Sequence, residues 1–194
     1  RWFDQKHGKL MAAHAWVKLH VMVGTVTNVV TGVKVSGEAD CPLLPELLSR
    51  TAKNFKVKEV SGDKAYLSKK NLEAIDAVGA VPFIAFKTNS VGMASKSPHW
   101  KRMWCHFSLK SEDFLARYHR RSNVETTMWM IKSKWGGGVR SKLPTAQINE
   151  VLAKVLCHNL ACIVHAVAEF GIDVDFWKVP ASSSTPPALA LVQP

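Results

Sequence analysis

The 194-residue chain is poor in acidic residues, which excludes an acidic or charge-balanced class of protein. It has 15 Asp and Glu against 26 Lys and Arg, a formal net charge of +11. Such a balance favours a polyanionic partner, nucleic acid first and an acidic membrane second; a basic protein without either partner is the plain alternative. Residues 87–142 hold much of the excess, with twelve Lys and Arg against three acids.

Cysteine is also scarce, and its spacing excludes a dense disulfide framework. The four cysteines form no C-x-x-C pair, which suits a reducing compartment. Cys105-His106, and His158, Cys162 and His165 at helical spacing, raise zinc as an alternative. A structural zinc site usually has paired ligands at short spacing, so buried cysteines and hydrogen-bonded histidines are the favoured interpretation.

The sequence lacks both a signal peptide and an uninterrupted membrane span. Its longest apolar stretch, residues 148–170, is interrupted by Lys154, His158, Asn159 and His165. We therefore predict a buried helix there and no membrane association.

The rest of the chain alternates between strand and helix patterns. Residues 16–23 and 29–37 alternate apolar and polar side chains around a turn, which predicts two half-buried antiparallel strands. The next elements are predicted as a helix over 45–53 and a strand ending at Gly62-Asp63. A helix over 69–78 follows, capped by Ser68 and stopped by Gly79. After it we predict a strand over 81–87, an irregular loop over 88–110, and helices over 112–135 and 145–170.

This order predicts an α/β fold with a mixed sheet flanked by helices, antiparallel in its first part and parallel after it. We expect the folded domain over 16–171, preceded by an edge segment over 1–15. The Pro/Ser/Ala-rich tail over 172–194 is expected to be disordered.

One helical segment has an unusual order of charges. At 100° per residue, Tyr118, Arg121, Glu125 and Lys132 fall on one narrow stripe that borders an apolar, core-facing stripe. The plain alternative is an amphipathic helix whose Arg121–Glu125 pair contributes about 0.3–0.5 kcal/mol. The more specific interpretation is a carboxylate at the rim of the core, flanked by cationic side chains that bind phosphates.

Asp63 is the second candidate acid. It directly follows a predicted strand, and α/β proteins bind ligands at the carboxyl ends of strands. Gly62 beside it would allow close approach of backbone or substrate. The plain alternative is a turn or capping aspartate.

The spacing Tyr-x2-Arg-x3-Glu-x6-Lys resembles the signature helix of the insertion-sequence DDE transposases, and Tyr118, Arg121, Glu125 and Lys132 fit every position. The segments KLHVMVGTVTNVVTGVKVSGEAD and VSGDKAY are also similar to that family, and they follow in the same order. The resemblance covers about residues 16–165. It implies an RNase H-like fold, action on DNA, and a cytoplasmic, nucleoid-associated location.

In that family Asp, Asp and Glu bind two divalent ions, usually Mg²⁺, with Mn²⁺ as the substitute. The resemblance implies that Asp63 is the second aspartate and Glu125 the glutamate, both catalytic and metal-binding. Two hard cations about 4 Å apart, held by oxygen ligands, stabilise the attacking and leaving oxygens of phosphoryl transfer.

The resemblance also implies DNA contacts. Arg121 and Lys132 would hold phosphates, with Arg120 beside them, and Tyr118 would orient a phosphate or stack on a base.

Four tryptophans lie in the basic region and could stack on unpaired bases. Trp100 and Trp104, in SPHWKRMWCHF, are the better candidates. Trp135 and Trp129 are expected to fill the core instead.

The family's first aspartate lies on a strand ahead of residues 16–23. Asp4 precedes that segment, but its surroundings do not have the pattern of a core strand, and Asp40 suits a helix start near Pro42. We therefore expect the first aspartate upstream of Arg1. The chain would then be a truncated piece, or a domain that has lost its chemistry.

The leading hypothesis is a transposase catalytic domain that cuts and joins DNA with two metal ions. Two alternatives stay open: a catalytically incomplete DNA-binding module of the same fold, and another RNase H-like nuclease. The expected partners are transposon ends and target DNA, and a homodimer on DNA is left open.

Overall fold

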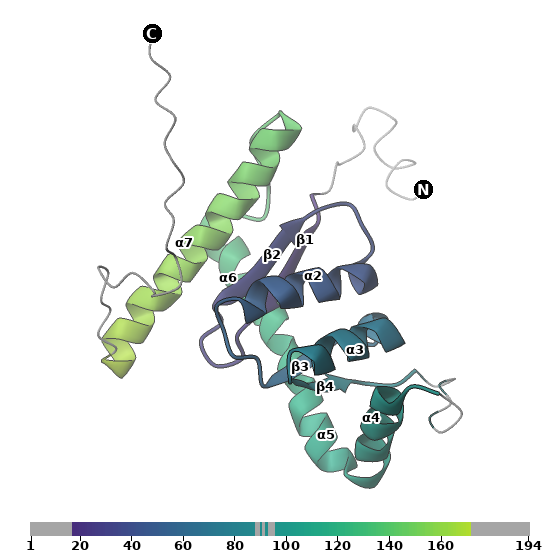
Figure 1. The fold of residues 1–194 in the computed structure, drawn as a ribbon. Helices are drawn as coiled ribbons and strands as arrows, with labels where there is room; N and C mark the ends of the chain where they lie inside the picture. The colour runs from purple at the N-terminus through teal and green to yellow at the C-terminus, as the bar shows by residue number, and fades with distance from the viewer. Residues whose placement is uncertain (1–16, 88–89, 91, 93–95, 172–194) are drawn as a thin grey trace, which may run out of the picture.

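The computed structural model describes residues 17–87, 90, 92 and 96–171 (Figure 1). The expectations for the edge segment, for Asp4 and for the tail over 172–194 lie outside the described residues.

The described chain begins with a β-hairpin, as predicted. Strands β1 (Leu19–Val23) and β2 (Val30–Val35) pair antiparallel. The connecting turn is closed by a hydrogen bond of 2.9 Å from the Gly24 amide to the Val29 carbonyl. Asn28 in this turn has a positive φ of 56°, which asparagine tolerates better than most residues.

A second sheet follows, also with the predicted strand directions. Strands β3 (Glu59–Gly62) and β4 (Val81–Ile84) pair in parallel. The crossover between them contains the short 3₁₀ helix η1 (Lys64–Tyr66) and helix α3 (Lys69–Ala77).

The ends of α3 confirm the predicted cap and stop. The Ser68 hydroxyl accepts a hydrogen bond of 3.2 Å from the Asn71 amide. Gly79 follows the helix with φ of +72°, a conformation that side chains with a Cβ rarely adopt.

The expectation of one mixed sheet is only partly met. Within the described residues the four strands form two separate two-stranded sheets, β1–β2 and β3–β4. The α/β class and the order of strand directions are as predicted, whereas the joining of the two sheets into one is not observed.

Five α-helices and a second 3₁₀ turn complete the described chain. They are α2 (Asp40–Ala52), α4 (Pro98–Leu109), α5 (Ser111–Tyr118), η2 (His119–Ser122), α6 (Asn123–Trp135) and α7 (Pro144–Phe170). The irregular loop predicted over 88–110 is wrong for its second part, which is α4. Pro98 lies in the first turn of α4, where its missing amide proton is not needed.

The continuous helix predicted over 112–135 is also wrong in one respect. The 3₁₀ turn η2 separates α5 from α6. A 3₁₀ helix advances about 120° per residue rather than 100°, so the turn rotates Tyr118 relative to Glu125. Tyr118 is buried, whereas the Glu125 side chain is 72% exposed.

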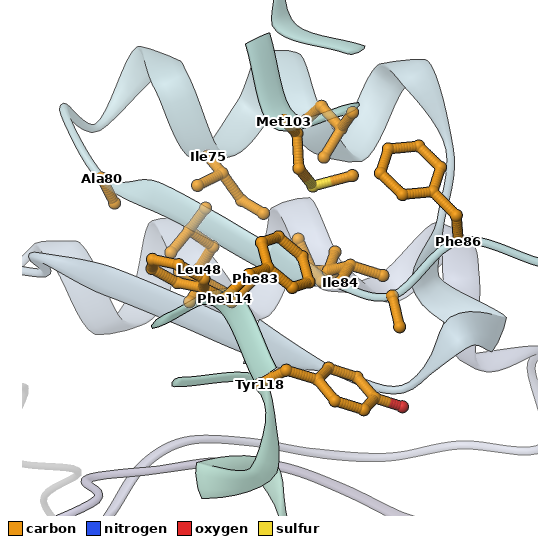
Figure 2. Close-up of a cluster of buried hydrophobic side chains, with 13 residues drawn as sticks. Leu48, Ile75, Ala80, Phe83, Ile84, Phe86, Met103, Phe114 and Tyr118 are labelled. Atoms are coloured by element: carbon orange, nitrogen blue, oxygen red, sulfur yellow. The ribbon is translucent and has the colours of Figure 1, made fainter. Parts of the chain in front are cut away.

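Two hydrophobic clusters hold these elements together. The larger lies where β3 and β4 meet α2, α3, α4 and α5, and Figure 2 shows Phe83, Ile84 and Phe114 at its centre. The smaller, built on Val30, Ile131 and Val155, joins the hairpin to α6 and α7.

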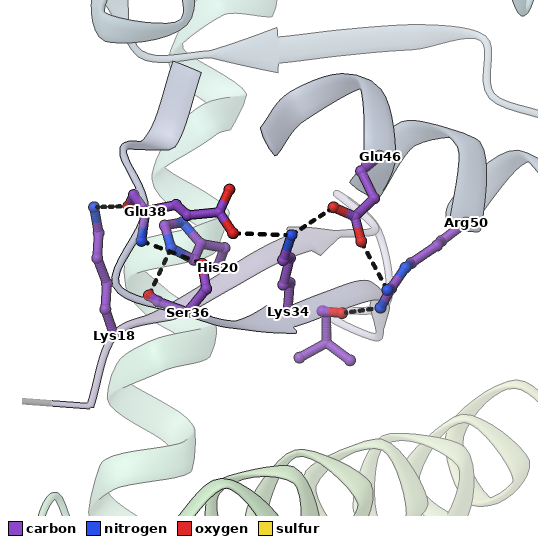
Figure 3. Close-up of polar contacts among 8 residues, drawn as sticks. Lys18, His20, Lys34, Ser36, Glu38, Glu46 and Arg50 are labelled. Carbon is purple, nitrogen blue, oxygen red and sulfur yellow. Dashed lines mark hydrogen bonds and ion pairs between the residues drawn. The ribbon is translucent and has the colours of Figure 1, made fainter. Parts of the chain in front are cut away.

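Most residues of the hairpin strands are partly buried, as predicted, and both faces of the hairpin are packed against other elements. Its apolar side packs on the smaller cluster, while Met22 packs on the larger one. His20, on the Met22 side, is 3% exposed. Its Nε2 donates a hydrogen bond to the Ser36 carbonyl (Figure 3). Its Nδ1 lies 2.9 Å from the Asp40 carboxylate. This contact ties the hairpin to the start of α2.

Helix α7 has the predicted bounds but not the predicted burial. Val155 is buried, whereas Leu152 is 36% and Leu156 60% exposed. In Figure 1 the helix runs along the hairpin side of the molecule and extends past it. By length and composition, the segment Pro144–Glu169 could also cross a membrane.

Candidate functional site

A cavity of about 290 Å³ lies between the two sheets. Its walls come from the end of β1, from β3 and the residue after it, from α2, and from the junction of η2 with α6. One edge of β1 and one edge of β3 therefore face the same space, although neither strand pairs with the other. The cavity brings together segments that are far apart in the chain.

Asp63 enters the cavity from the carboxyl end of β3. Its Oδ1 accepts a hydrogen bond of 2.6 Å from the Lys64 amide, so it caps η1. The cap holds the carboxylate at the cavity wall. A Cβ on Gly62 would meet Ile84 and Tyr66 at 3.6 and 3.7 Å, an ordinary contact, so the backbone here is not packed tightly enough to require glycine.

Glu125 enters the same cavity from the first turn of α6. Its Oε1 lies 3.2 Å from Arg121 Nη1. This is the i,i+4 pair that the sequence allows, and an exposed pair of this kind contributes little to stability. Glu125 is thus held at the rim but remains open to a ligand.

Arg121 lines the same cavity as the two acids. Partial burial acts to lower its pKa, but the neighbouring Tyr118, Asp63 and Glu125 together raise the pKa above the ordinary arginine value. The guanidinium lies 5.3 Å from the centre of the Tyr118 ring. Arg121 Nε is buried and has no hydrogen-bond partner within the described part of the chain.

The other predicted DNA-contacting residues lie in different surroundings. Arg120 lines the cavity, and its Nη1 is 3.4 Å from Glu59 Oε2. Tyr118 is 7% exposed and belongs to the larger cluster. Lys132 is exposed nearly two turns beyond Glu125 and does not line the cavity.

The expected roles of the tryptophans are partly reversed. Trp100 and Trp104 are half-buried, and each ring contacts Phe86 edge-on, with centroids 5.2 and 4.8 Å away. The prediction that Trp129 fills the core is wrong, because it is 68% exposed. Trp135 packs on the smaller cluster, as expected. Its position four residues after Glu125, one helical turn, could have indicated that Trp129 lies on the same exposed side of α6 as Glu125.

Glu59 is a cavity-lining acid that no sequence pattern indicates. It pairs with Arg117 and Arg120, and Arg117 also binds Asp113. Hydrogen bonds lower the pKa of Asp113; the one from His106 has the larger effect and the one from Arg117 the smaller. Glu59 is thereby engaged by two cations, which leaves Asp63 and Glu125 as the acids better placed for a ligand.

The donor set suits a hard cation but is short of a full site. Carboxylate oxygens are the ligands that Mg²⁺ and Mn²⁺ prefer, and Asp63 and Glu125 supply them to one cavity. Within residues 17–171, where described, no three Asp, Glu, His or Cys side chains form a metal-binding group. Asp40 is bound by His20 and Lys18.

The zinc alternative receives no support from the described residues. His158 Nε2 lies 2.9 Å from the Asn28 carbonyl and 3.4 Å from Cys162 Sγ. His165 pairs instead with Glu169, and Cys105 is an exposed free thiol. His158 is a buried, hydrogen-bonded histidine, as the favoured interpretation expected, whereas its expectation of buried cysteines is wrong for Cys105 and Cys157, which are exposed.

Comparison with known protein families identifies a match over most of the chain. The family model described as "Transposase DDE domain" matches residues 1–160. Neither the curated proteins nor the solved structures contain a match.

Proposed function

The chain belongs to the family of transposases with a DDE domain, and on that premise we propose that it is the catalytic domain that cleaves and transfers DNA strands. The observation that carries the proposal is the shared cavity: Asp63 and Glu125 line it from segments far apart in the chain, and Arg121, which pairs with Glu125, lines it as well. Its substrate would place the protein on the nucleoid, in the cytoplasm.

Asp63 and Glu125 are the residues that would hold divalent cations, Mg²⁺ or Mn²⁺, two ions in the complete site. When bound, such ions stabilise charge on the attacking and leaving oxygens of a phosphoryl transfer. The chain's own residues position the two carboxylates. The Lys64 amide donates a hydrogen bond to Asp63, and Arg121 donates one to Glu125 at the rim of the cavity.

Arg121 is the cation best placed for a phosphate. Its buried Nε lacks a partner among the described residues, and a phosphate oxygen would satisfy that donor with a charge-assisted hydrogen bond. Arg120 lies beside it on the same cavity wall. Tyr118 is buried, so we assign it to positioning Arg121 through the ring contact rather than to touching DNA.

Beyond the cavity, α6 offers a path for the rest of the strand. Trp129 and Lys132 follow Glu125 by four and seven residues on this helix, and both are exposed. An exposed indole can stack on any base, and a lysine neutralises phosphate charge. Trp129 thus replaces Trp100 and Trp104 as the proposed stacking residue.

The third carboxylate would come from a strand between β1 and β3. Each of these strands has an edge on the cavity, and an unpaired edge is a template for another strand. We propose that a further strand pairs with both edges and joins the two sheets into one RNase H-like sheet. An aspartate on that strand would lie close to Asp63 and Glu125.

A DNA-binding module without catalysis is the second candidate. It is favoured by the incomplete acidic set, since the described residues contain no group of three metal ligands. Another RNase H-like nuclease is the third candidate, and it would retain cleavage without joining DNA ends.

Metal-dependent nicking of supercoiled DNA by the intact protein tests these candidates. Asp63→Asn and Glu125→Gln should each abolish nicking in Mg²⁺ and Mn²⁺ while DNA binding persists. Glu73→Gln is the matched control, because Glu73 is exposed on α3 outside the cavity. Full nicking by either cavity variant would overturn the proposal; binding without nicking by the wild type would favour the second candidate.

A further inference from the structure

Glu125 lies in a helical turn whose start is not fixed by a helix cap. Helix α6 begins at Asn123, directly after the 3₁₀ turn η2. Within the described chain, Ser122 at the N-cap makes no capping hydrogen bond, and its hydroxyl donates instead to the His119 carbonyl at 3.0 Å. A cap normally fixes the end of a helix by binding the free amides of its first turn. The position of Glu125 therefore depends on contacts with other elements.

Asn123 makes such a contact, two residues before Glu125. Its half-buried side-chain amide donates hydrogen bonds of 2.6 Å to the Thr25 carbonyl and 3.4 Å to Asn28 Oδ1. The two hydrogens of one amide group can serve both acceptors. Thr25, Asn123 and Glu125 all line the cavity. The contact therefore lies at the cavity wall and ties the start of α6 to the turn of the hairpin.

The hairpin turn is already fixed without Asn123. The Gly24 amide donates to the Val29 carbonyl at 2.9 Å, and the Asn28 amide donates to the Gly24 carbonyl at 3.0 Å. From α7, His158 donates a hydrogen bond of 2.9 Å to the Asn28 carbonyl. The turn is thus the fixed partner of this contact, and the start of α6 is the part that the contact positions.

The other end of the segment that leads into α6 is held on strand β3. The Ser61 hydroxyl donates a hydrogen bond of 2.8 Å to the Arg117 carbonyl near the end of α5, and the Arg117 side chain pairs with Glu59 of the same strand. Asp63 follows the end of this strand. Contacts at both ends therefore hold η2, and they set the position of Glu125 relative to Asp63.

We propose that Asn123 is a positioning residue that holds Glu125 in register with Asp63, so that the two carboxylates can bind divalent cations together. The inference rests on the proposed function, because that function assigns the cations to these two acids. Asn123 acts through the direction of the first turn of α6 and not by touching the cation. Removal of a group that orients a metal ligand typically lowers metal affinity or activity by about 10- to 100-fold.

Mn²⁺ binding to the intact protein, followed by electron paramagnetic resonance of the free ion, tests the proposal without DNA. Asn123→Ala should weaken Mn²⁺ binding about tenfold or more, while its circular dichroism should match the wild type because alanine favours the helix. Asn28→Gly removes only the longer contact of 3.4 Å and tolerates the positive φ of this position, so it should weaken binding by less. Asn54→Ala is the matched control, because Asn54 is exposed beyond the end of α2 and outside the cavity.

Each outcome of this titration has a defined meaning. Equal Mn²⁺ affinity in Asn123→Ala and the wild type would overturn the proposal, whatever the change in urea unfolding, because a purely structural contact alters stability without altering metal affinity. If Asn123→Ala does not fold, Asn28→Gly decides, and an unchanged affinity in that variant would overturn the proposal. A wild type that binds Mn²⁺ but does not nick DNA would count against the proposed cleavage alone. A wild type that binds no Mn²⁺ would overturn this inference, whatever its nicking activity.

Discussion

At the scale of single residues, Arg121 shows both the value and the limit of the sequence pattern. The spacing correctly predicts its contact with Glu125, which is 3.2 Å away. It does not predict that the charge of Asp63, which follows strand β3, also raises the pKa of Arg121. That neighbour comes from folding, because helix periodicity describes only residues of one helix.

Glu150 provides a residue-scale prediction about acid stability. Hydrogen bonds from the Ser141 and Arg140 amides lower the pKa of Glu150 to about 2. A carboxyl group whose pKa is lower in the folded state stabilises the fold above its unfolded pKa of about 4.5. This stabilisation is lost as pH falls from about 4.5 to 2, because the folded state must then take up the proton.

We therefore expect Glu150→Gln to be less stable than the wild type at pH 7 and to differ little from it at pH 2. Urea unfolding at several pH values measures this difference. Glu73→Gln, at an exposed position of α3, is the control and should show no comparable convergence. A constant difference between Glu150→Gln and the wild type at every pH would contradict the assignment.

At the scale of elements, the crossing of α2 over β2 depends on Gly32. A Cβ at this position would lie 2.8 Å from Thr51 Oγ1 and 2.9 Å from the Leu47 carbonyl oxygen. The carbonyl belongs to the helix backbone and cannot turn aside, so Gly32→Ala should push α2 away from the strand. We expect a loss of about 1–3 kcal/mol in the free energy of unfolding.

Gly37→Ala is the matched control for Gly32→Ala. Nothing lies within 4 Å of a Cβ at Gly37, and surface substitutions of this kind usually change stability by about 0.5 kcal/mol or less. Chemical denaturation of both variants measures the difference. Equal stabilities would mean that α2 does not approach β2 as closely as described.

The elements also show where sequence patterns succeed and fail. The strands at 19–23 and 59–62 and the cap at Ser68 were predictable because they follow local rules of alternation and capping. Helix α4 was missed because its Trp, His and Lys composition is typical of a loop, although its buried Met103 faces the core. Whether a predicted apolar helix is covered, as for α7, depends on packing and is not a local property.

At the scale of the whole molecule, charge and stacking should contribute separately to DNA binding. The net charge of +11 predicts affinity that falls steeply with salt. Lys132→Ala should reduce the slope of log K against log salt by about one. Trp129→Ala should weaken binding to single-stranded DNA by about 1–3 kcal/mol without changing that slope, because stacking releases no counterions.

Fluorescence anisotropy with a labelled oligonucleotide at several salt concentrations separates the two effects. Trp129→Phe keeps an aromatic face and should recover most of the affinity. Lys53→Ala removes an exposed lysine at the C-cap of α2, outside the proposed DNA path, and should leave the slope unchanged. An unchanged affinity for Trp129→Ala would remove this residue from the proposed DNA path.

The sequence by itself determined the α/β class, the strand directions, the family and the two acids at positions 63 and 125, because these follow from local periodicity and from residue types at set spacings. Only the tertiary structure decided that the two acids share a cavity, that Tyr118 is buried and Trp129 exposed, and that α7 leaves apolar side chains exposed. These outcomes depend on distances between segments remote in the chain and on the 3₁₀ turn that rotates one helix against the next, and no pattern within a single element contains that information.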